Sequence, residues 1–330
     1  MMRVNIIGVD NGAGLSRNIE ILFSILREKM EVHVTRMPDD RRHDFAARAG
    51  RAGLRVKNHQ ACRLYRFPSF KYDVNLFLEH IWPEWLSCAR KNILLPNQEW
   101  FREECMPYLD CMDMVMCKTR HAEEIFSRLD CPVCYTSFAS EDRMLPDVPR
   151  DYNKLIHIPG KSLLKGTGLI VSIWKKHPDW PRLKSFQSHS SAPIERLPNV
   201  EFVTDYLPND ELRYLQNTHS LHLCPSESEA FGHYIDEAMS AGALTVVTDA
   251  PPMNELAAAD RAIMVEYRSS EPLLLGMRYY VDPESLEERI GGALSMDISE
   301  KRRMGNRARE WYTENAEMFR RKTIELFMGL

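Results

Sequence analysis

The residues best suited to chemistry lie between residues 225 and 242, in the stretch P-S-E-S-E-A-F-G-H-Y-I-D-E-A-M-S-A-G. An apolar run ends in a Pro-Ser turn, and the pattern after it predicts a helix that opens at Gly232 and closes at the last glycine. Amide groups at the start of a helix attract anions, so those of Phe231, Gly232 and His233 are predicted to bind a diphosphate. Glu237 follows about a turn and a half later, where its carboxylate could accept hydrogen bonds from both hydroxyls of a ribose.

Glu229 precedes this helix, and Gly232 has no side chain to keep a ligand away from the backbone. We therefore place Glu229 beside the group that the diphosphate carries. A surface helix with two solvated glutamates is the competing interpretation, and the spacing of the glutamates alone would favour it. The full order of strand, turn, Glu, Phe-Gly, helix, Gly and strand favours a ligand site.

This stretch resembles the signature of family 4 of the retaining GT-B glycosyltransferases: Glu, seven residues, Glu, with Phe-Gly between them and Glu-Ala-Met-Ser-Ala-Gly at the end. The N-V-E-F-V-T-D-Y-L-P-N-D-E-L of 199–212 and the T-V-V-T-D of 245–249 also fit, so the resemblance covers most of residues 154–260. It implies an α/β protein of two Rossmann-like, doubly wound parallel-sheet domains that face each other across a cleft. It also implies transfer of a sugar from a nucleoside diphosphate sugar to a hydroxyl, with retention at the anomeric carbon.

The resemblance extends to the loop after the first strand of the second half, which contains Gly160, Lys161, Ser162 and Lys165. The family usually has Gly-Arg here and Lys-Gly shortly afterwards, and both cations hold the phosphates of the donor. Lys161 would replace the arginine, which keeps the charge but loses the bidentate geometry. Two solvated lysines are the competing interpretation. A P-loop is excluded because Leu155 stands where that motif requires a glycine.

The segment D-N-G-A-G-L-S of 10–16 follows the first strand and opens a helix. It fails as a dinucleotide fingerprint because Arg17 stands where the third glycine should be. It resembles the glycine-bearing first loop of GT-B enzymes, which implies that Gly12 and Gly14 border the diphosphate of the donor. An ordinary turn between a strand and a helix is the alternative.

Two polar segments follow the strands predicted at 74–78 and 93–96: Glu79-His80 and Asn97-Gln98-Glu99. Residues at the carboxyl ends of parallel strands line the ligand crevice of such sheets. His80 and Asn97 are therefore candidates for the acceptor or sugar side of the site. The family often carries a histidine on one of these loops, and the second loop here has Asn97 instead. For His80, a strand-end histidine without a special role is the alternative.

Residues 41–57 contain six Lys or Arg against one acidic residue. On a helix they would form a basic stripe, which GT-B enzymes with lipid-linked or phosphorylated acceptors often hold against a membrane surface. A solvated basic face is the alternative.

Short apolar strands alternate with amphipathic helices, which predicts parallel α/β domains. The polar stretch M-L-P-D-V-P-R-D-Y-N of 144–153 is the best boundary. It separates an acceptor-side domain, 1–148, from a nucleotide-sugar-binding domain, 149–330, whose last helix at about 308–330 could pack back on the first. Strands are expected at 3–8, 31–36, 74–78, 93–96, 114–118, 133–137, 154–158, 183–186, 200–203, 220–224, 244–248 and 262–265, with helices from there to the end.

Composition narrows the class of protein. A length of 330 residues predicts two domains, and a net charge of −4 argues against nucleic acid as a partner. The eight cysteines are scattered in apolar runs, which indicates reduced thiols in a cytoplasmic protein. Cys131 and Cys134 form a C-x-x-C with no second pair or His cluster at metal spacing. The chain opens on a strand rather than a signal peptide, so a cytoplasmic location is expected, with contact at the inner face of the membrane as an option.

The resemblance thus implies a glycosyltransferase in which Lys161, Lys165 and Glu229 are catalytic, with no cofactor and no metal. Its partners would be a nucleotide-sugar donor and a glycan, lipid-linked or small-molecule acceptor, in the assembly of a bacterial-type glycan, lipopolysaccharide or glycolipid. The nucleotide base, the sugar and the acceptor are not specified by these residues. Two alternatives are a nucleotide-sugar epimerase on the same fold and a catalytically silent GT-B module that binds a glycan or a partner.

Overall fold

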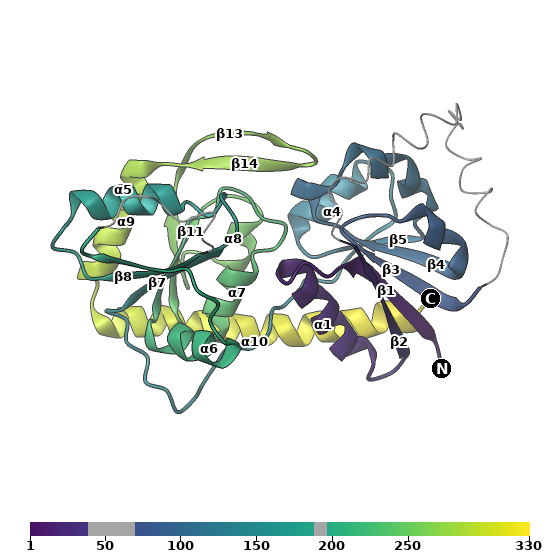
Figure 1. Cartoon of the computed structure of the whole chain (residues 1–330), viewed down its shortest axis with the longest axis horizontal. Coiled ribbons are helices and arrows are strands. Elements are labelled where there is room, and N and C mark those ends of the chain that lie inside the picture. Colours follow the sequence, from purple (N-terminus) through teal and green to yellow (C-terminus); the bar gives the residue numbers. More distant parts are fainter. Residues whose placement is uncertain (39–69, 188–196) are drawn as a thin grey trace. The chain divides into compact units, whose positions relative to one another are not determined.

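The computed structural model describes residues 1–38, 70–187 and 197–330, so the basic stretch 41–57 lies outside the described residues. The described chain forms two compact units, which Figure 1 shows in the colours of the sequence. Unit 1 consists of Met1–Phe138, Leu273–Gly276 and Glu317–Leu330, and unit 2 of Ala139–Pro272 and Met277–Ala316.

Unit 1 is built on a six-stranded parallel sheet with the strand order β2-β1-β3-β4-β5-β6. Helix α1 packs against β1 and β3 through Leu15, Ile19 and Leu22, whose spacing puts them on one face. Thr119 caps helix α4, since its hydroxyl accepts a hydrogen bond from the amide of Ala122 at 3.1 Å. The elements are β1 (Arg3–Val9), α1 (Gly14–Leu26), β2 (Glu31–Met37), β3 (Tyr72–Leu78), η1 (Pro83–Cys88), β4 (Ala89–Leu95), η2 (Gln98–Trp100), η3 (Glu103–Cys111), β5 (Met114–Cys117), α4 (Arg120–Ser127) and β6 (Val133–Tyr135).

Unit 2 is built on a second six-stranded parallel sheet with the order β12-β11-β10-β7-β8-β9. Helices lie on both faces of this sheet, with α5 and α9 on one side and α6 on the other (Figure 1). Its elements are β7 (Leu155–Gly160), α5 (Thr167–Lys176), β8 (Leu183–Gln187), β9 (Val200–Val203), α6 (Asn209–Thr218), β10 (Leu221–Cys224), α7 (His233–Ser240), β11 (Leu244–Thr248), α8 (Met253–Leu256), β12 (Ile263–Val265), β13 (Tyr267–Leu273), β14 (Gly276–Val281), α9 (Pro283–Ser295) and the first part of α10 (Ile298–Met328), whose last residues belong to unit 1.

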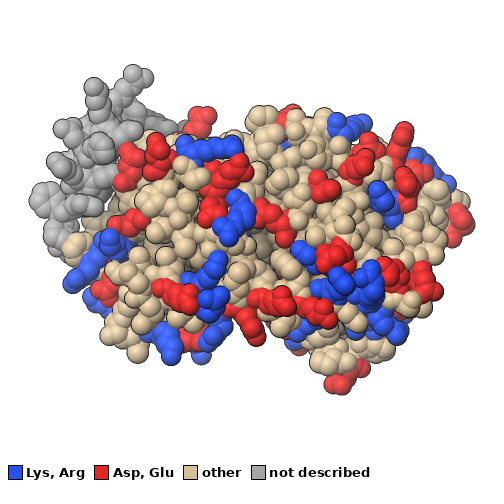
Figure 2. All heavy atoms as spheres, turned by 180° about the vertical axis from the view of Figure 1, so that it is seen from behind, with Lys and Arg blue, Asp and Glu red and all other residues tan. Residues whose placement is uncertain are grey.

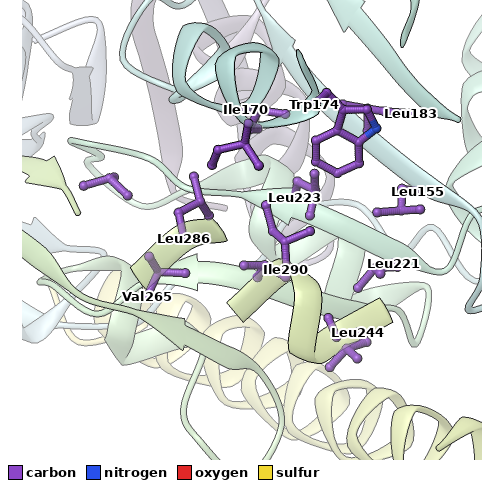
Figure 3. Close-up of a cluster of buried hydrophobic side chains, with 14 of the residues drawn as sticks. Leu155, Ile170, Trp174, Leu183, Leu221, Leu223, Leu244, Val265, Leu286 and Ile290 are labelled. Atoms are coloured by element: carbon purple, nitrogen blue, oxygen red, sulfur yellow. The ribbon is translucent and has the colours of Figure 1, made fainter. Parts of the chain in front are cut away.

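The core of unit 2 lies between sheet and helices (Figure 3). Trp174 of α5 and Ile290 of α9 pack with Leu155 and Leu223 of the sheet, and all four are fully buried. Each such side chain contributes about 1.5–3 kcal/mol to folding. This core fixes β7 and β10, the two strands whose following loops carry the candidate site.

The prediction of two doubly wound parallel α/β sheets is confirmed, and every predicted strand is present. The prediction of helices only after residue 265 is wrong, because β13 and β14 form a two-stranded sheet before α9 begins. The residues of this hairpin lack a helical period, and Leu274 takes a φ of 53° at the turn.

The segment 139–148, assigned to the first domain from the sequence, belongs to unit 2. It is held there by hydrogen bonds: the amide of Ser140 donates to Asp236 at 2.6 Å, and the amide of Leu145 donates to Asn217 at 3.0 Å. Glu317–Leu330, at the end of α10, is part of unit 1.

Six of the cysteines in the described residues are free thiols. Cys111 is disulfide-bonded, so the expectation of reduced, buried thiols is wrong for this residue. It lies half-buried at the end of η3 rather than inside a strand.

In the face that Figure 2 shows, acidic and basic side chains are interspersed over the described residues. Among those residues, no helix combines the length and the apolar character needed to cross a membrane.

Candidate functional site

The strand order of unit 2 reverses between β7 and β10, because the chain continues from β7 to β8 on one side and from β10 to β11 on the other. At such a switch point the loops after the two strands diverge and leave a crevice beyond the carboxyl ends. The loop after β7 contains Lys161 and Lys165, and the loop after β10 contains Glu229. The two predicted parts of the donor site thus follow neighbouring strands.

The two loops are in direct contact. The amide of Glu227 donates a hydrogen bond to the carbonyl of Leu164 at 2.8 Å. Gly166 has a φ of +71°, and a Cβ there would lie 2.6 Å from the carbonyl oxygen of Pro225. Glycine is therefore required at 166, both for its left-handed backbone and for the close approach of the loops.

Helix α7 starts directly after Gly232, which takes a φ of +102°. The amides of Ile235 and Asp236 donate to the carbonyl of Gly232 at 3.0 and 3.1 Å, so the first turn is regular. The side chain of Phe231 is buried and lies edge-on to the ring of His233, with 5.7 Å between centroids. A ligand would therefore meet the backbone of Phe231 rather than its side chain.

Lys165 and Glu229 form an ion pair, and their side chains are only 14% and 11% exposed. Two residues that the sequence analysis did not single out support this pair. Ser226 Oγ donates to Glu229 Oε1 at 2.6 Å and is 2.5 Å from the hydroxyl of Tyr234. The ammonium of Lys165 lies 4.1 Å from the centroid of the Tyr234 ring. Burial raises the pKa of Tyr234 well above its usual value, so the phenol keeps its proton.

Glu237 lies in the same helix, and only 3% of its surface is exposed. Its Oε2 accepts a hydrogen bond from Nε2 of Gln216 on α6 at 3.0 Å. In the sequence, the one signal for Gln216 is that a polar residue stands among the core-facing positions of α6. In the structure its side chain is fully buried.

The remaining donor-side candidates are less closely tied to this pair. Lys161 is exposed, and its side chain forms no ion pair or hydrogen bond with another described residue. Ser162 Oγ accepts from the amide of Leu164 at 3.2 Å, which shapes the turn. Gly160 has a φ of +61° and open space where a Cβ would be, so this turn is accessible to a ligand.

Unit 1 has a switch point of its own, between β1 and β3. In the loop after β1, Gly12 has a φ of +62°, and its amide donates to Ser16 Oγ at 2.7 Å. Ser16 Oγ in turn donates to Asp10 at 2.6 Å. A phosphate would have to displace Ser16 to reach this amide. Gly14 is the first residue of α1.

The strand ends of unit 1 assemble a polar cluster from four residues: Glu79, His80, Asn97 and Lys118. Nε2 of His80 lies 3.2 Å from Oε1 of Glu79, and the amide of Asn97 donates to Oε2 of the same carboxylate at 2.5 Å. The ammonium of Lys118 donates to Oδ1 of Asn97. Glu79 has a φ of 66°, an uncommon conformation for this residue type that is often found at functional sites. His80 and Asn97 are thus brought together, and Glu79 and Lys118 were missed.

Buried histidines in the two units carry different charges. Burial lowers the pKa of His80, but the neighbouring Cys105 and Glu79 outweigh it and bring the pKa to about 9. His157 and His222 are fully buried in unit 2 and hydrogen-bond to backbone carbonyls, and burial brings the pKa of each to about 4. His80 is therefore cationic at neutral pH, whereas His157 and His222 are neutral core residues.

Within the described ranges, no group of three or more His, Cys, Asp or Glu side chains is arranged to hold a metal ion. Cys131 and Cys134 have free thiols. Burial raises the pKa of both, which keeps them protonated at neutral pH.

Two units, each built on a doubly wound parallel sheet with a switch point, have the architecture of the GT-B fold, and comparison with known proteins agrees. Residues 185–311 match the model of the family described as glycosyl transferases group 1. The matched region contains Glu229, Gly232 and Glu237, and it begins after the loop with Lys161 and Lys165. No curated protein sequence matches the chain.

Solved structures match over the whole chain. HepE of Anabaena, in complex with UDP and glucose, has a TM-score of 0.71 and 12% identity, with 100% of both chains covered. Sucrose-phosphate synthase from Thermosynechococcus elongatus has a TM-score of 0.70 and 12% identity, covering 100% of this chain and 99% of that one. An α,α-trehalose-phosphate synthase (UDP-forming) from Burkholderia vietnamiensis has a TM-score of 0.63 and 10% identity, covering 99% and 100%. The chain therefore has the GT-B fold.

Proposed function

We propose that this chain is a retaining glycosyltransferase that transfers a sugar from a nucleoside diphosphate sugar to a hydroxyl acceptor without a metal ion. The observation that carries the proposal is the Lys165–Glu229 pair at the switch point of unit 2, directly before the start of α7. The match of residues 185–311 to the glycosyl transferases group 1, and a similar structure that holds UDP and glucose, support it.

The departing diphosphate is the group that needs stabilisation. Negative charge builds on it as the bond to the sugar breaks, and preorganised cations and amides lower the barrier by stabilising that charge. Lys165, Lys161 and the first-turn amides of α7 are the groups proposed for this task. Glu229 would accept hydrogen bonds from the sugar, and Glu237 from the ribose of the nucleotide.

The Lys165–Glu229 ion pair can exchange its partners for groups of the donor when the donor binds. In the structure the ammonium is paired with the carboxylate and lies over the Tyr234 ring. On donor binding the ammonium would gain a phosphate oxygen, and Glu229 would turn its acceptor capacity to the sugar hydroxyls. No group has to gain or lose a proton for this rearrangement.

The acceptor side is assigned to unit 1. His80 and Asn97 are the candidate contacts, and the imidazolium of His80 would attract an acceptor that carries negative charge. A glycan, lipid-linked or small-molecule acceptor, in the assembly of a bacterial-type glycan, lipopolysaccharide or glycolipid, fits this assignment. The cytoplasmic location and the membrane contact of residues 41–57 stay predictions.

The proposal is tested first by a thermal-shift panel of UDP, GDP and ADP with their sugars. A ligand that binds only the folded state at about 100 times its Kd stabilises it by about 2.7 kcal/mol. The donor so selected is then incubated with acceptors, with and without EDTA, and the anomeric configuration of the product is read by NMR. Donor consumption without any acceptor would point to an epimerase. If none of the nucleotides binds, the chain would instead be a silent module.

A further inference from the structure

The carboxylate of Glu237 is held by a chain of side chains that begins outside the motif. Nε of Arg143 donates to Oε1 of Gln216 at 2.7 Å, and Nε2 of Gln216 donates to Oε2 of Glu237 at 3.0 Å. None of the three residues is more than 3% exposed. The chain therefore runs through the interior of unit 2, from segment 139–148 through α6 to α7.

The chemistry of the two ends fixes the orientation of the Gln216 amide. A guanidinium can only donate hydrogen bonds, and a carboxylate can only accept them. The amide therefore satisfies both neighbours in one orientation alone, with its oxygen toward Arg143 and its nitrogen toward Glu237. The alternative would place two donors and two acceptors face to face.

Arg143 itself forms several further hydrogen bonds, so the first residue of this hydrogen-bonded series is held in place. Its Nη1 donates to Oδ1 of Asn209 at 2.8 Å and to Glu141 at 3.0 Å. The backbone amide of Arg143 donates to Oγ of Ser240 at 2.9 Å, and that hydroxyl donates to the carbonyl of Glu237 at 2.7 Å. Arg143 is thus tied to the helix turn that carries Glu237 as well as to its side chain.

We propose that Gln216 and Arg143 are positioning residues that hold the Glu237 carboxylate in the orientation that accepts the ribose hydroxyls of the donor. They thereby set the preference of the site for ribonucleotides over deoxyribonucleotides. This inference rests on the proposed function, in which Glu237 binds the ribose. A carboxylate fixed before binding loses less conformational freedom when the ligand arrives, and so binds it more tightly.

A buried polar network could also serve only to hold segment 139–148 against α6. Asn217, the neighbour of Gln216, provides the matched control because it is equally buried and serves the same segment. Its side chain donates to the carbonyl of Arg143 at 2.8 Å and accepts from the amide of Leu145 at 3.0 Å. Asn217 has no hydrogen bond to Glu237 in the structure, so its loss should disturb the segment without changing the preference for ribose.

The test measures the Kd of UDP and of 2′,3′-dideoxy-UDP for the full chain by calorimetry. The ratio is the Kd of the dideoxy analogue divided by the Kd of UDP. GDP and its dideoxy analogue replace them if the thermal-shift panel selects guanine. In the unchanged protein we expect a ratio of about 10 to 100, because hydrogen bonds to a charged group are lost with the hydroxyls. Glu237→Gln and Gln216→Met should both bring the ratio below about 5, and their combination should lower it no further, because the two residues act as one unit. Asn217→Leu should keep the original ratio.

Gln216→Glu provides a second variant should Gln216→Met fail to fold. It keeps the volume and the acceptor for Arg143 but, once ionised, cannot donate to Glu237. Its ratio should be low at pH 8 and recover as the pH falls and a shared proton restores the donor.

A ratio that stays near that of the unchanged protein in Gln216→Met, but falls in Glu237→Gln, would overturn the inference and leave the proposed function intact. A ratio that falls equally in Asn217→Leu would also overturn it, since the network would then be only structural. A ratio unaffected by Glu237→Gln would instead overturn the ribose role of Glu237 on which the inference rests.

Discussion

The polar clusters at the strand ends of the two units are assembled in different ways. In unit 2, Glu229, Gly232 and Glu237 come from one continuous stretch, and Lys165 joins them from the loop after the neighbouring strand. In unit 1, Glu79, Asn97 and Lys118 follow three different strands, which lie side by side only because of the sheet order β3-β4-β5. A contiguous site leaves an ordered pattern in the sequence, whereas a dispersed site becomes visible only with the topology.

The clusters also differ in how charge is balanced. Lys165 and Glu229 compensate each other across a single contact, so a ligand can replace either partner. The chain from His80 through Glu79 and Asn97 to Lys118 holds two cations and one carboxylate. Removing one charge should therefore change binding and turnover in unit 2, but protonation and stability in unit 1.

The largest expected effect is on turnover. Lys165→Met should lower kcat by about 100- to 1000-fold, because a preorganised cation at the leaving diphosphate is lost. The exposed Lys176, which pairs with Glu287 in the same unit, is the matched control, and Lys176→Met should stay within about twofold. Steady-state kinetics with a saturating donor measures both. A loss of less than tenfold in Lys165→Met would remove Lys165 from the leaving-group site.

The next effect concerns the protonation of His80 in unit 1. Glu79→Gln removes the carboxylate that helps to bring the pKa of His80 to about 9, so the pKa should fall toward or below 6.5. A raised histidine pKa contributes stability that is fully present below pH 6.5 and is lost as the pH rises through 9. The variant should thus be less stable by about 3 kcal/mol at pH 6, with the difference fading by pH 9.

An NMR titration of the imidazole and denaturant unfolding at several pH values would check this prediction. The exposed Glu84, in the 3-10 helix after His80, gives the control variant Glu84→Gln. An unchanged His80 titration in Glu79→Gln would show that the Glu79 carboxylate does not set the charge of the cluster.

An effect on stability with the opposite sign is expected in unit 2. Burial raises the pKa of Asp236 to about 7, and one of its oxygens has no hydrogen-bond partner in the described structure. Between pH 3.8 and 7 the folded protein holds a proton that the unfolded chain has released, so the stability falls as the pH rises. Asp236→Asn removes this penalty, and its gain in stability should grow by at most about 1.4 kcal/mol per pH unit and level off above pH 7. Parallel stability curves for the two proteins from pH 4 to 8 would contradict the shift.

The smallest effect concerns the contact between the β13–β14 hairpin and the loop after β10, which contains Glu227 and Glu229. The guanidinium of Arg278 on β14 donates to Glu227 at 2.7 and 2.9 Å, and the amide of Tyr279 donates to the carbonyl of the same residue at 2.7 Å. Arg278→Met should weaken donor binding by about two- to fivefold, as expected for a partly exposed ion pair worth up to about 1 kcal/mol. The exposed Arg268 on β13 gives the control Arg268→Met. Equal Kd values for the two variants would leave the loop independent of Arg278.

The same contrast explains what the sequence could predict. The alternation of strands and helices follows from apolar periodicity, and the donor loop is contiguous, so both were accessible. Ser226 and Tyr234 were not, because a buried tyrosine in a helix has the pattern of a core residue. Gln216 and Arg143 were missed because their roles depend on contacts between residues far apart in the sequence. Gln216 is 21 positions from Glu237, and Arg143 is 73 positions from Gln216. The hairpin was missed because long-range pairing, not local periodicity, decides a two-stranded sheet.

Helix α10 has a consequence for the order in which the protein can form during synthesis. Its final residues complete unit 1: the rings of Phe319 and Phe138 lie 4.6 Å apart, and the ammonium of Lys322 donates to the carbonyl of Tyr135 at 3.2 Å. These residues, at the end of the yellow helix α10 in Figure 1, are made after all of unit 2. Most of unit 1 is translated first, but the unit is complete only after residues 317–330 have been made.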